Sequence, residues 1–151
     1  MTKPTASKRR VAQQKPTYGL DEQVGFILRQ VSQRHTAIFA NEIGVNLTAT
    51  QWAAMAKLAE TGPCSQNQLG RLTAMDVATI KGVIDRLTAR GLTETGPDPS
   101  DGRRLLVKLS RAGQALVDKC IANALKVSEL TLEPLTPKER ELFVALLTKL
   151  R

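Results

Sequence analysis

The chain leaves its helical hydrophobic period once and then returns to it, and this pattern constrains the fold more than any other feature of the sequence. Between residues 20 and 91 the apolar residues recur at spacings of three and four, which indicates amphipathic helices. Residues 92–95 and 105–109 are strand-like runs, separated by a segment rich in Gly, Pro and Asp. Residues 110–150 are again helical in pattern. The sequence therefore predicts a mainly α fold with a single hairpin.

Helix start signals divide the part before the hairpin. After a long first helix over residues 20–42, Thr48 and Gln51 have the spacing of a capping box. Ser65 and Asp76 can each cap one of two shorter helices that follow in quick succession. We therefore expect four helices before the hairpin, the last two joined by a tight turn.

Two further start signals follow the hairpin. Ser110 can cap a helix that stops before Pro134. Thr136, Pro137 and Glu139 combine a cap, a proline at the first helical position and a capping-box glutamate. The chain should therefore close with two helices.

The helix capped by Asp76 has distinct inner and outer faces. Its apolar residues Val77, Ile80, Ile84 and Leu87 are expected to face the core. The residues left on the outside or at its edges are Ala78, Thr79, Lys81, Gly82, Asp85 and Arg86.

Two short helices followed by a hairpin with arginine at its tip form a winged helix-turn-helix, whose second helix is sized for a DNA major groove. The methyl groups of Ala78 and Thr79 could contact thymine, and Lys81 can reach a guanine edge or a phosphate. Gly82 would let the helix approach the groove closely, and Arg86 lies one turn further along. Taken alone, Thr79 is equally explained as a solvated helix residue, but the order of the elements favours DNA binding.

The hairpin tip and the start of the first short helix complete the predicted interface. Arg103 and Arg104 suit a narrow minor groove, and Asp101 is close enough in sequence to orient the Arg103 guanidinium. A surface ion pair is the alternative role for Arg103. The residues expected to hold a phosphate at the helix start are Ser65, Gln66 and Asn67.

Over residues 20–151 the sequence resembles the MarR family of bacterial transcription regulators. The resemblance is carried by Leu69-Gly70-Arg71-Leu72, residues 79–87, Arg90-Gly91-Leu92 and the wing, residues 98–110. The family's Asp-x-Arg wing signature falls on Asp101 and Arg103. The chain departs from the family at Gly82, where an arginine is common.

The charge of the chain is unevenly distributed. Its 22 Lys and Arg against 14 Asp and Glu give a net charge of +8, which attracts polyanions. The first 17 residues contain no acid and five cations, Lys3, Lys8, Arg9, Arg10 and Lys15. We expect residues 1–18 to be a disordered basic arm, which either solubilises the protein or binds phosphates.

The remaining chain is expected to form one domain with three parts. Residues 19–46 form an N-terminal dimerisation helix, residues 47–110 the winged helix-turn-helix, and residues 111–151 two C-terminal dimerisation helices. Two copies can read a pseudo-palindromic DNA operator with half-sites one helical turn apart. The last helix has more apolar residues than an isolated tail needs, which favours a homodimer, although packing within one chain is the alternative.

His35 marks a second candidate site. It lies about 20° from Val24 around the first helix, so it should point inward. It is either a core histidine with one hydrogen-bond partner or part of a ligand cavity between the first two helices. The expected lining residues of such a cavity are Arg34, His35, Phe39, Trp52 and Met55.

The resemblance implies a ligand for this cavity. MarR-like proteins commonly bind small aromatic acids between their dimerisation and DNA-binding parts. Residues 31–39 are similar to repressors of aromatic acid catabolism, in particular its nicotinic acid branch, which implies a hydroxylated nicotinate as effector. Its binding would release the repressor from DNA.

Other functions have weaker support in the sequence. We find no Gly-rich phosphate loop, nucleophile elbow or metal-ligand cluster, so we expect neither an enzyme nor a cofactor. Cys64 precedes a helix start whose dipole could lower the pKa of its thiol, which would suit a redox-sensing regulator. An architectural DNA binder without an effector is a further alternative. With no secretory signal and no long apolar run, we expect a cytoplasmic protein without a membrane partner.

Overall fold

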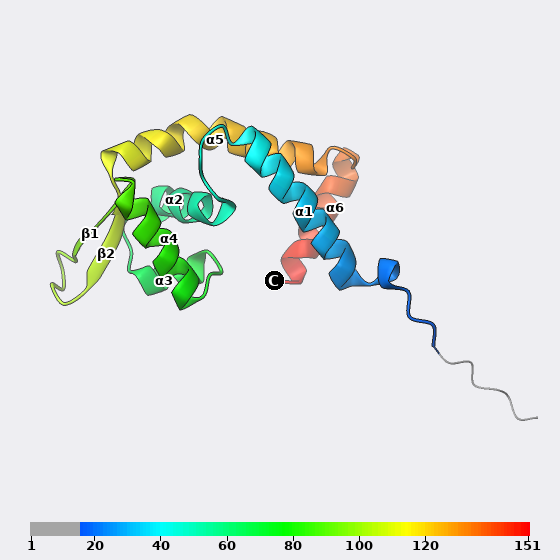
Figure 1. Cartoon of the computed structure of the whole chain (residues 1–151), viewed down its shortest axis with the longest axis horizontal. Helices are drawn as coiled ribbons and strands as arrows, with labels where there is room; N and C mark the ends of the chain where they lie inside the picture. The colour runs from blue at the N-terminus through cyan, green and yellow to red at the C-terminus, as the bar shows by residue number, and fades with distance from the viewer. Residues whose placement is uncertain (1–15) are drawn as a thin grey trace, which may run out of the picture.

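The computed structural model of the protein describes residues 16–151 (Figure 1). The basic arm expected at the N-terminus therefore lies, up to residue 15, outside the described residues. The elements in chain order are the 3-10 helix η1 (Leu20–Glu22), α1 (Val24–Glu42), α2 (Ala49–Thr61), α3 (Gln66–Leu72), α4 (Val77–Ala89), β1 (Thr93–Pro97), β2 (Leu105–Leu109), α5 (Arg111–Leu132) and α6 (Pro137–Lys149). The predicted mainly α fold with one hairpin is confirmed.

The helices begin where the capping signals predict. The Thr48 hydroxyl accepts a hydrogen bond from the Gln51 amide, and the Thr48 amide donates to Gln51 Oε1. Thr136 and Glu139 form the same reciprocal pair at the start of α6. The first helix differs from the prediction, because the extended backbone of Gln23 separates η1 from α1.

The hairpin is joined to the helical core by a third short segment. β1 and β2 pair antiparallel, with Thr93 opposite Leu109 and Pro97 opposite Leu105. The Cys64 amide donates to the Val107 carbonyl at 3.1 Å, and the Val107 amide donates back to the Cys64 carbonyl at 2.8 Å. The loop between α2 and α3 is thereby fixed to the base of the hairpin.

The buried apolar residues form two clusters. The larger cluster joins α2, α3, α4 and the hairpin and has Leu69, Ile80 and Leu87 at its centre. The smaller one lies between α1 and α5 and includes Phe39 and Cys120. Helix α5 runs from the hairpin to the end of the molecule that holds α1 and α6 (Figure 1). It therefore connects the two parts of the fold.

One predicted core residue of α4 is wrong. Val77 is 67% exposed, whereas Val83, which was not expected in the core, is 0% exposed. At 100° per residue, Val77 lies about 70° from the centre of the buried stripe and Val83 about 50° from it on the other side. Val77 also begins the helix, where its side chain projects past the packed core.

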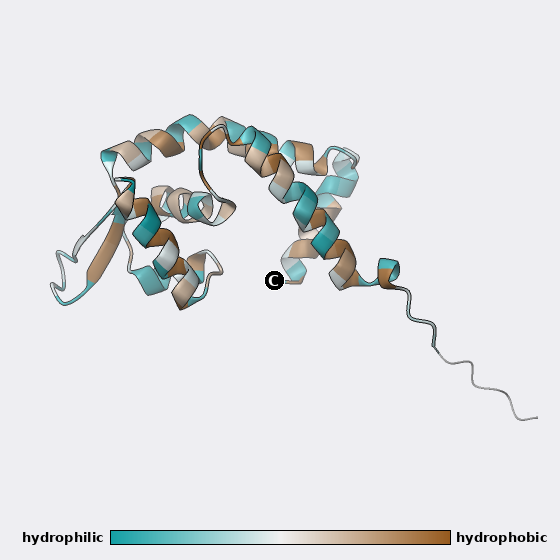
Figure 2. Cartoon of the chain, viewed as in Figure 1, coloured by the Kyte–Doolittle hydropathy of each residue, from teal (hydrophilic) through white to brown (hydrophobic). Residues whose placement is uncertain are grey.

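The end of the molecule around α1 and α6 exposes many apolar side chains. No residue of α6 is buried, and apolar segments recur along α1, α5 and α6 (Figure 2). The exposed large apolar residues on these helices and at the C-cap of α6 are Val24, Ile27, Leu28, Val31, Ile121, Leu125, Leu142, Val144, Leu146, Leu147 and Leu150. Among the described residues, no helix has the length and hydrophobicity that a membrane span requires.

Candidate nucleic-acid interface and ligand site

The start of α4 is fixed by its N-cap. Asp76 Oδ1 accepts a hydrogen bond from the Thr79 amide at 2.7 Å, and Oδ2 accepts one from the Thr79 hydroxyl at 3.0 Å. These two bonds favour the ionised carboxylate and lower the pKa of Asp76. The exposed first turn, which includes Ala78, is thus held in one orientation toward solvent.

The next two turns of α4 present charged groups that are already paired or packed. Lys81 Nζ lies 2.6 Å from Asp85 Oδ2, and both side chains are exposed. The Arg86 guanidinium lies along Gly82, because Nη1 of Arg86 is 3.5 Å from where a Cβ at this position would stand. Lys81 and Arg86 are therefore on the outer side of α4, as predicted.

The start of α3 lies beside the hairpin. Ser65 Oγ accepts a hydrogen bond from the Gln68 amide, which confirms the predicted cap. Ser65, Gln66 and Asn67 line a hollow of about 300 Å³ together with residues of both strands. The predicted phosphate-binding residues and the hairpin thus face the same hollow.

The tip of the hairpin is stabilised by two aspartates. Asp98 Oδ1 accepts hydrogen bonds from the amide and the hydroxyl of Ser100, which lower the pKa of Asp98. Asp101 Oδ1 accepts from the Arg103 amide at 3.1 Å. The prediction that Asp101 orients the Arg103 guanidinium is therefore wrong, because the carboxylate binds the backbone of the tight turn instead. Arg103 and Arg104 are exposed, and within residues 16–151 neither forms an ion pair.

Arg34 and His35 contact the last turn of α5. The Arg34 guanidinium donates to the carbonyl of Thr131 at 2.6 Å and to that of Leu130 at 2.9 Å. His35 Nδ1 lies 2.9 Å from Thr131 Oγ1, and this hydroxyl donates its hydrogen to the Val127 carbonyl at 2.7 Å. Since a hydroxyl has one hydrogen, Nδ1 of His35 must be the donor to Thr131. The other ring nitrogen, Nε2, is bonded to no described residue.

The structure does not bring all five predicted effector residues to one cavity between α1 and α2. Met55 is 0% exposed in the larger cluster, Phe39 is buried in the smaller one, and Trp52 packs against both. The hollow that includes Arg34 measures about 290 Å³ and lies between α1, α5 and α6. Its lining residues are Val31, Arg34, Thr131, Leu132, Pro134, Leu135 and Phe143. The predicted cavity between the first two helices is therefore wrong, because α1 packs on α5 rather than on α2.

The structure does not support Cys64 as the reactive thiol of a redox-sensing regulator. Cys64 is buried at the base of the hairpin, and this burial raises the pKa of its thiol instead of lowering it. A higher pKa leaves less of the reactive thiolate. Cys120 is buried in the other cluster, and burial raises the pKa of its thiol as well.

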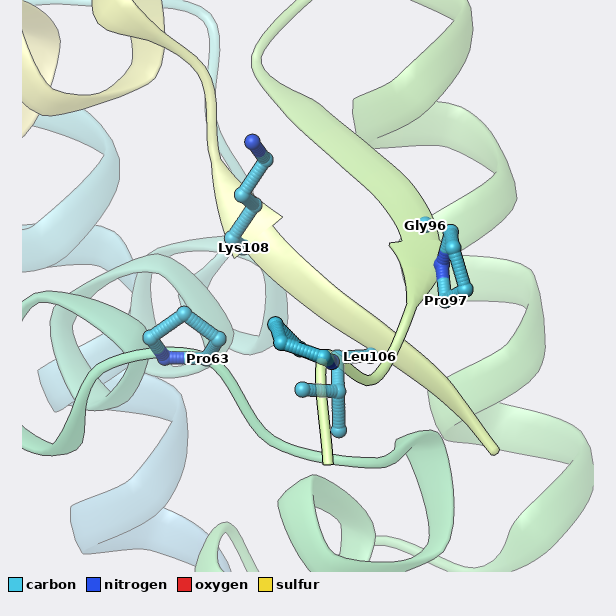
Figure 3. A pocket seen from close by; sticks show the side chains of 6 residues that line it. Pro63, Gly96, Pro97, Leu106 and Lys108 are labelled. Carbon is cyan, nitrogen blue, oxygen red and sulfur yellow. The ribbon is translucent and has the colours of Figure 1, made fainter. Parts of the chain in front are cut away.

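Another hollow, of about 250 Å³, lies on the hairpin where it meets the loop after α2 (Figure 3). Its lining residues are Pro63, Gly96, Pro97, Pro99, Leu106 and Lys108. The lining is mostly apolar and has no acid or histidine. Within residues 16–151 there is also no group of three or more His, Cys, Asp or Glu side chains that could hold a metal ion.

Comparison with known proteins assigns this geometry to a family. A sequence model of the MarR family matches residues 47–105, which span α2 to the start of β2. The transcriptional repressor NicR of Pseudomonas putida is 42% identical over 134 residues, which are 88% of this chain and 85% of NicR. The chain belongs to the MarR family. It is a DNA-binding transcriptional regulator, and these relatives are regulators rather than enzymes.

Two solved structures extend the likeness beyond the winged part. A probable transcriptional regulator from Pseudomonas aeruginosa is 57% identical, with a TM-score of 0.86, and the match covers 88% of this chain and 100% of that one. BpsR from Bordetella bronchiseptica, whose DNA binding is regulated by 6-hydroxynicotinic acid, is 41% identical with a TM-score of 0.85. That match covers 89% of this chain and 97% of BpsR. The MarR-family likeness therefore includes α1, α5 and α6.

The sequence analysis misassigned one residue of this MarR-family chain and did not select another. Val77 was assigned to the core, although its place at the edge of the apolar stripe could have marked it as exposed. Thr131, which binds both Arg34 and His35, is 96 residues from His35 in the sequence, and no local pattern connects them.

Proposed function

We propose that the protein is a homodimeric repressor that binds a pseudo-palindromic DNA operator and is released from it by a small aromatic carboxylate of the hydroxynicotinate class. The observation that carries the proposal is the exposed apolar surface on α1, α5 and α6. This surface lies at the end of the molecule away from the winged helix, so a second copy can bind there and leave both recognition helices accessible.

The DNA interface combines three groups of residues. Helix α4 enters the major groove with Ala78, Thr79, Lys81 and Gly82, while Arg86 lies beside the phosphates. Asp101 holds the turn from which Arg103 and Arg104 reach the minor groove. The phosphate contacts at the start of α3 are made by Ser65, Gln66 and Asn67.

The effector site is centred on Arg34 and His35. The Arg34 guanidinium supplies a positive charge for a carboxylate, at the edge of an apolar hollow whose wall includes Phe143. Nε2 of His35 has no partner among the described residues and can form a hydrogen bond with the hydroxyl or ring nitrogen of a hydroxynicotinate. The regulation of BpsR by 6-hydroxynicotinic acid supports this ligand class. Trp52, Phe39 and Met55 lie outside this hollow and act through packing in the two clusters.

The release mechanism uses the connection between the two parts of the fold. Arg34 and His35 hold the C-terminal end of α5, and the N-terminal end of α5 follows the hairpin. A ligand that moves this contact changes the spacing of the two recognition helices in the dimer. A tenfold loss of operator affinity needs only about 1.4 kcal/mol of differential binding.

The first experiment is a thermal-shift titration with 6-hydroxynicotinate, nicotinate and benzoate. A ligand that binds only the folded protein raises the melting temperature. We expect the largest rise with 6-hydroxynicotinate, and the same compound should release the protein from DNA upstream of its own gene. Sequence-insensitive binding that ignores all three acids would favour the architectural alternative.

A matched pair of variants tests the site. His35→Ala should leave dimerisation and operator binding intact but raise the ligand concentration needed for release at least tenfold. Thr36→Ala is the control, because the exposed Thr36 hydroxyl binds only the Ser32 carbonyl of its own helix. An unchanged response of His35→Ala would remove His35 from the ligand site.

A further inference from the structure

Val77 is an unusual residue for the surface of a recognition helix. It is the first residue of α4 and is 67% exposed, although valine is normally buried. It forms part of the wall of a hollow of about 280 Å³ between α3 and α4, together with Asn67 and Arg71. Two thirds of its surface is left uncovered within residues 16–151, so its side chain is free to contact a molecule that approaches the start of α4.

The polar groups of α4 that follow Val77 already have partners. The Thr79 hydroxyl donates to Asp76, and the Lys81 ammonium is 2.6 Å from a carboxylate oxygen of Asp85. The groups without such partners at the start of α4 are the methyl groups of Val77, Ala78 and Thr79. The leading edge of α4 is therefore apolar.

An apolar leading edge has one counterpart on the base edges of the major groove. The donors and acceptors of guanine, cytosine and adenine are polar, whereas thymine also presents its C5-methyl group there. The N-terminal residues of a recognition helix are the ones that contact base edges. We propose that Val77 is a specificity-determining residue that contacts the C5-methyl group of a thymine in each operator half-site.

This inference rests on the proposed function, because it requires sequence-specific binding of duplex DNA. It adds to the thymine contacts expected for Ala78 and Thr79, because the branched side chain of Val77 projects further than the methyl of Ala78. The Thr79 side chain is held by its hydroxyl in the cap of α4, so its methyl group cannot turn freely toward a base. The preference for thymine at one position per half-site is thus assigned mainly to Val77.

The test removes the methyl group from the DNA and the side chain from the protein separately. The bound sequence is first selected from random duplexes, and each thymine of a half-site is then replaced by uracil, which lacks only the methyl group. At one thymine per half-site the wild type should lose about fourfold in affinity, the effect of one buried methyl group. Val77→Ala should bind the thymine and uracil duplexes equally at this position.

Two further variants serve as controls. Val77→Thr keeps the size and one methyl group of the side chain and should retain most of the preference for thymine. Arg103→Ala should weaken binding of the thymine and uracil duplexes by the same factor, because a contact in the minor groove does not depend on a methyl group in the major groove. Equal melting temperatures of wild type and Val77→Ala would exclude an effect through folding.

The outcomes separate this inference from the function on which it rests. If uracil weakens binding of the wild type and of Val77→Ala by the same factor at every position, Val77 contacts no thymine methyl, although the protein remains a sequence-specific regulator. If the selection enriches no sequence, the proposed function fails and the inference fails with it.

Discussion

The winged part of the chain and the end formed by α1 and α6 differ in how completely one copy buries its apolar residues. Helix α4 buries four residues, whereas α6 buries none and α1 buries only Phe39. The fold of the winged part is therefore determined within one chain. The other end has apolar residues on three helices that one chain leaves in water, which supports the proposal that a second copy covers them.

The number of exposed apolar side chains on α6 supports an interaction site at this end of the molecule. Burying an aliphatic side chain of this kind contributes about 1.5–3 kcal/mol. Leu142, Leu146 and Leu150 lie at intervals of four on one side of α6 and are all exposed. Such a patch is unusual on a monomer and marks an interaction site.

Replacing apolar residues of α6 by aspartate should have the largest effect on operator affinity. It tests whether the winged part stays folded when the apolar surface on α6 is disrupted. Leu146→Asp with Leu150→Asp should give a folded monomer whose operator affinity is lower by roughly a thousandfold, because the second half-site no longer binds with the first. Sedimentation and DNA titration measure the two effects. Thr148→Asp, on the opposite side of α6, is the control and should remain a dimer. A double variant that stays dimeric would contradict a dimer interface that includes α6.

Glycine at the start of α5 gives the next largest effect. A Cβ at Gly113 would clash with the Leu92 carbonyl oxygen, so Gly113→Ala must displace the backbone where α5 meets the winged part. We expect a loss of about 3 kcal/mol in the free energy of unfolding, measured in urea. Gly82→Ala is the matched control, because its Cβ meets only the Arg86 side chain at ordinary contact distance. Equal stability of the two variants would show that this junction is not close-packed.

A smaller effect is expected from the exposed arginine of the wing. Arg103→Ala should lower operator affinity about tenfold and reduce the slope of log K against log salt by about one per protomer. Lys57→Ala is the control, since it removes the same charge from an ion pair with Glu60 on α2. If both variants change the slope equally, the effect is one of net charge and the wing makes no specific contact.

The smallest expected effect concerns pH and the start of α4. The pKa of Asp76 is lower in the folded protein than its unfolded value of about 3.9, so its contribution is complete above that value and is lost as pH falls through the folded pKa. Asp76→Asn keeps an oxygen that can cap α4 but does not titrate. Wild type and variant should melt at similar temperatures at pH 7, and the wild type should lose more stability below about pH 4. Parallel pH profiles would contradict the cap.

The sequence was sufficient to predict the helix starts, because each depends on residues that are close together in the chain. The caps at Thr48, Ser65, Asp76 and Thr136 were predicted because an N-cap and its partner lie within four residues. Val77 was misplaced because hydrophobic periodicity alone does not decide a residue at the edge of a buried stripe. For Asp101, the sequence spacing to Arg103 was correct, but it did not distinguish the guanidinium from the backbone amide.

The candidate ligand site could be predicted only in part. Arg34 and His35 were selected for their place on the first helix, but the partner helix was assigned by sequence proximity. The structure pairs α1 with α5, and a contact across 96 residues depends on the whole fold. Phe39 and Met55 were chosen as apolar walls, and in the structure they are core residues of separate clusters.

The most direct test of the account is a hydroxyl-radical footprint of the protein on its selected operator, with and without 6-hydroxynicotinate. Two copies joined through α1, α5 and α6 should protect two patches on one face of the duplex, about 10 base pairs apart, and both patches should disappear together when the ligand is added. A single protected patch, or two patches that the ligand removes separately, would contradict a dimer completed by its second copy.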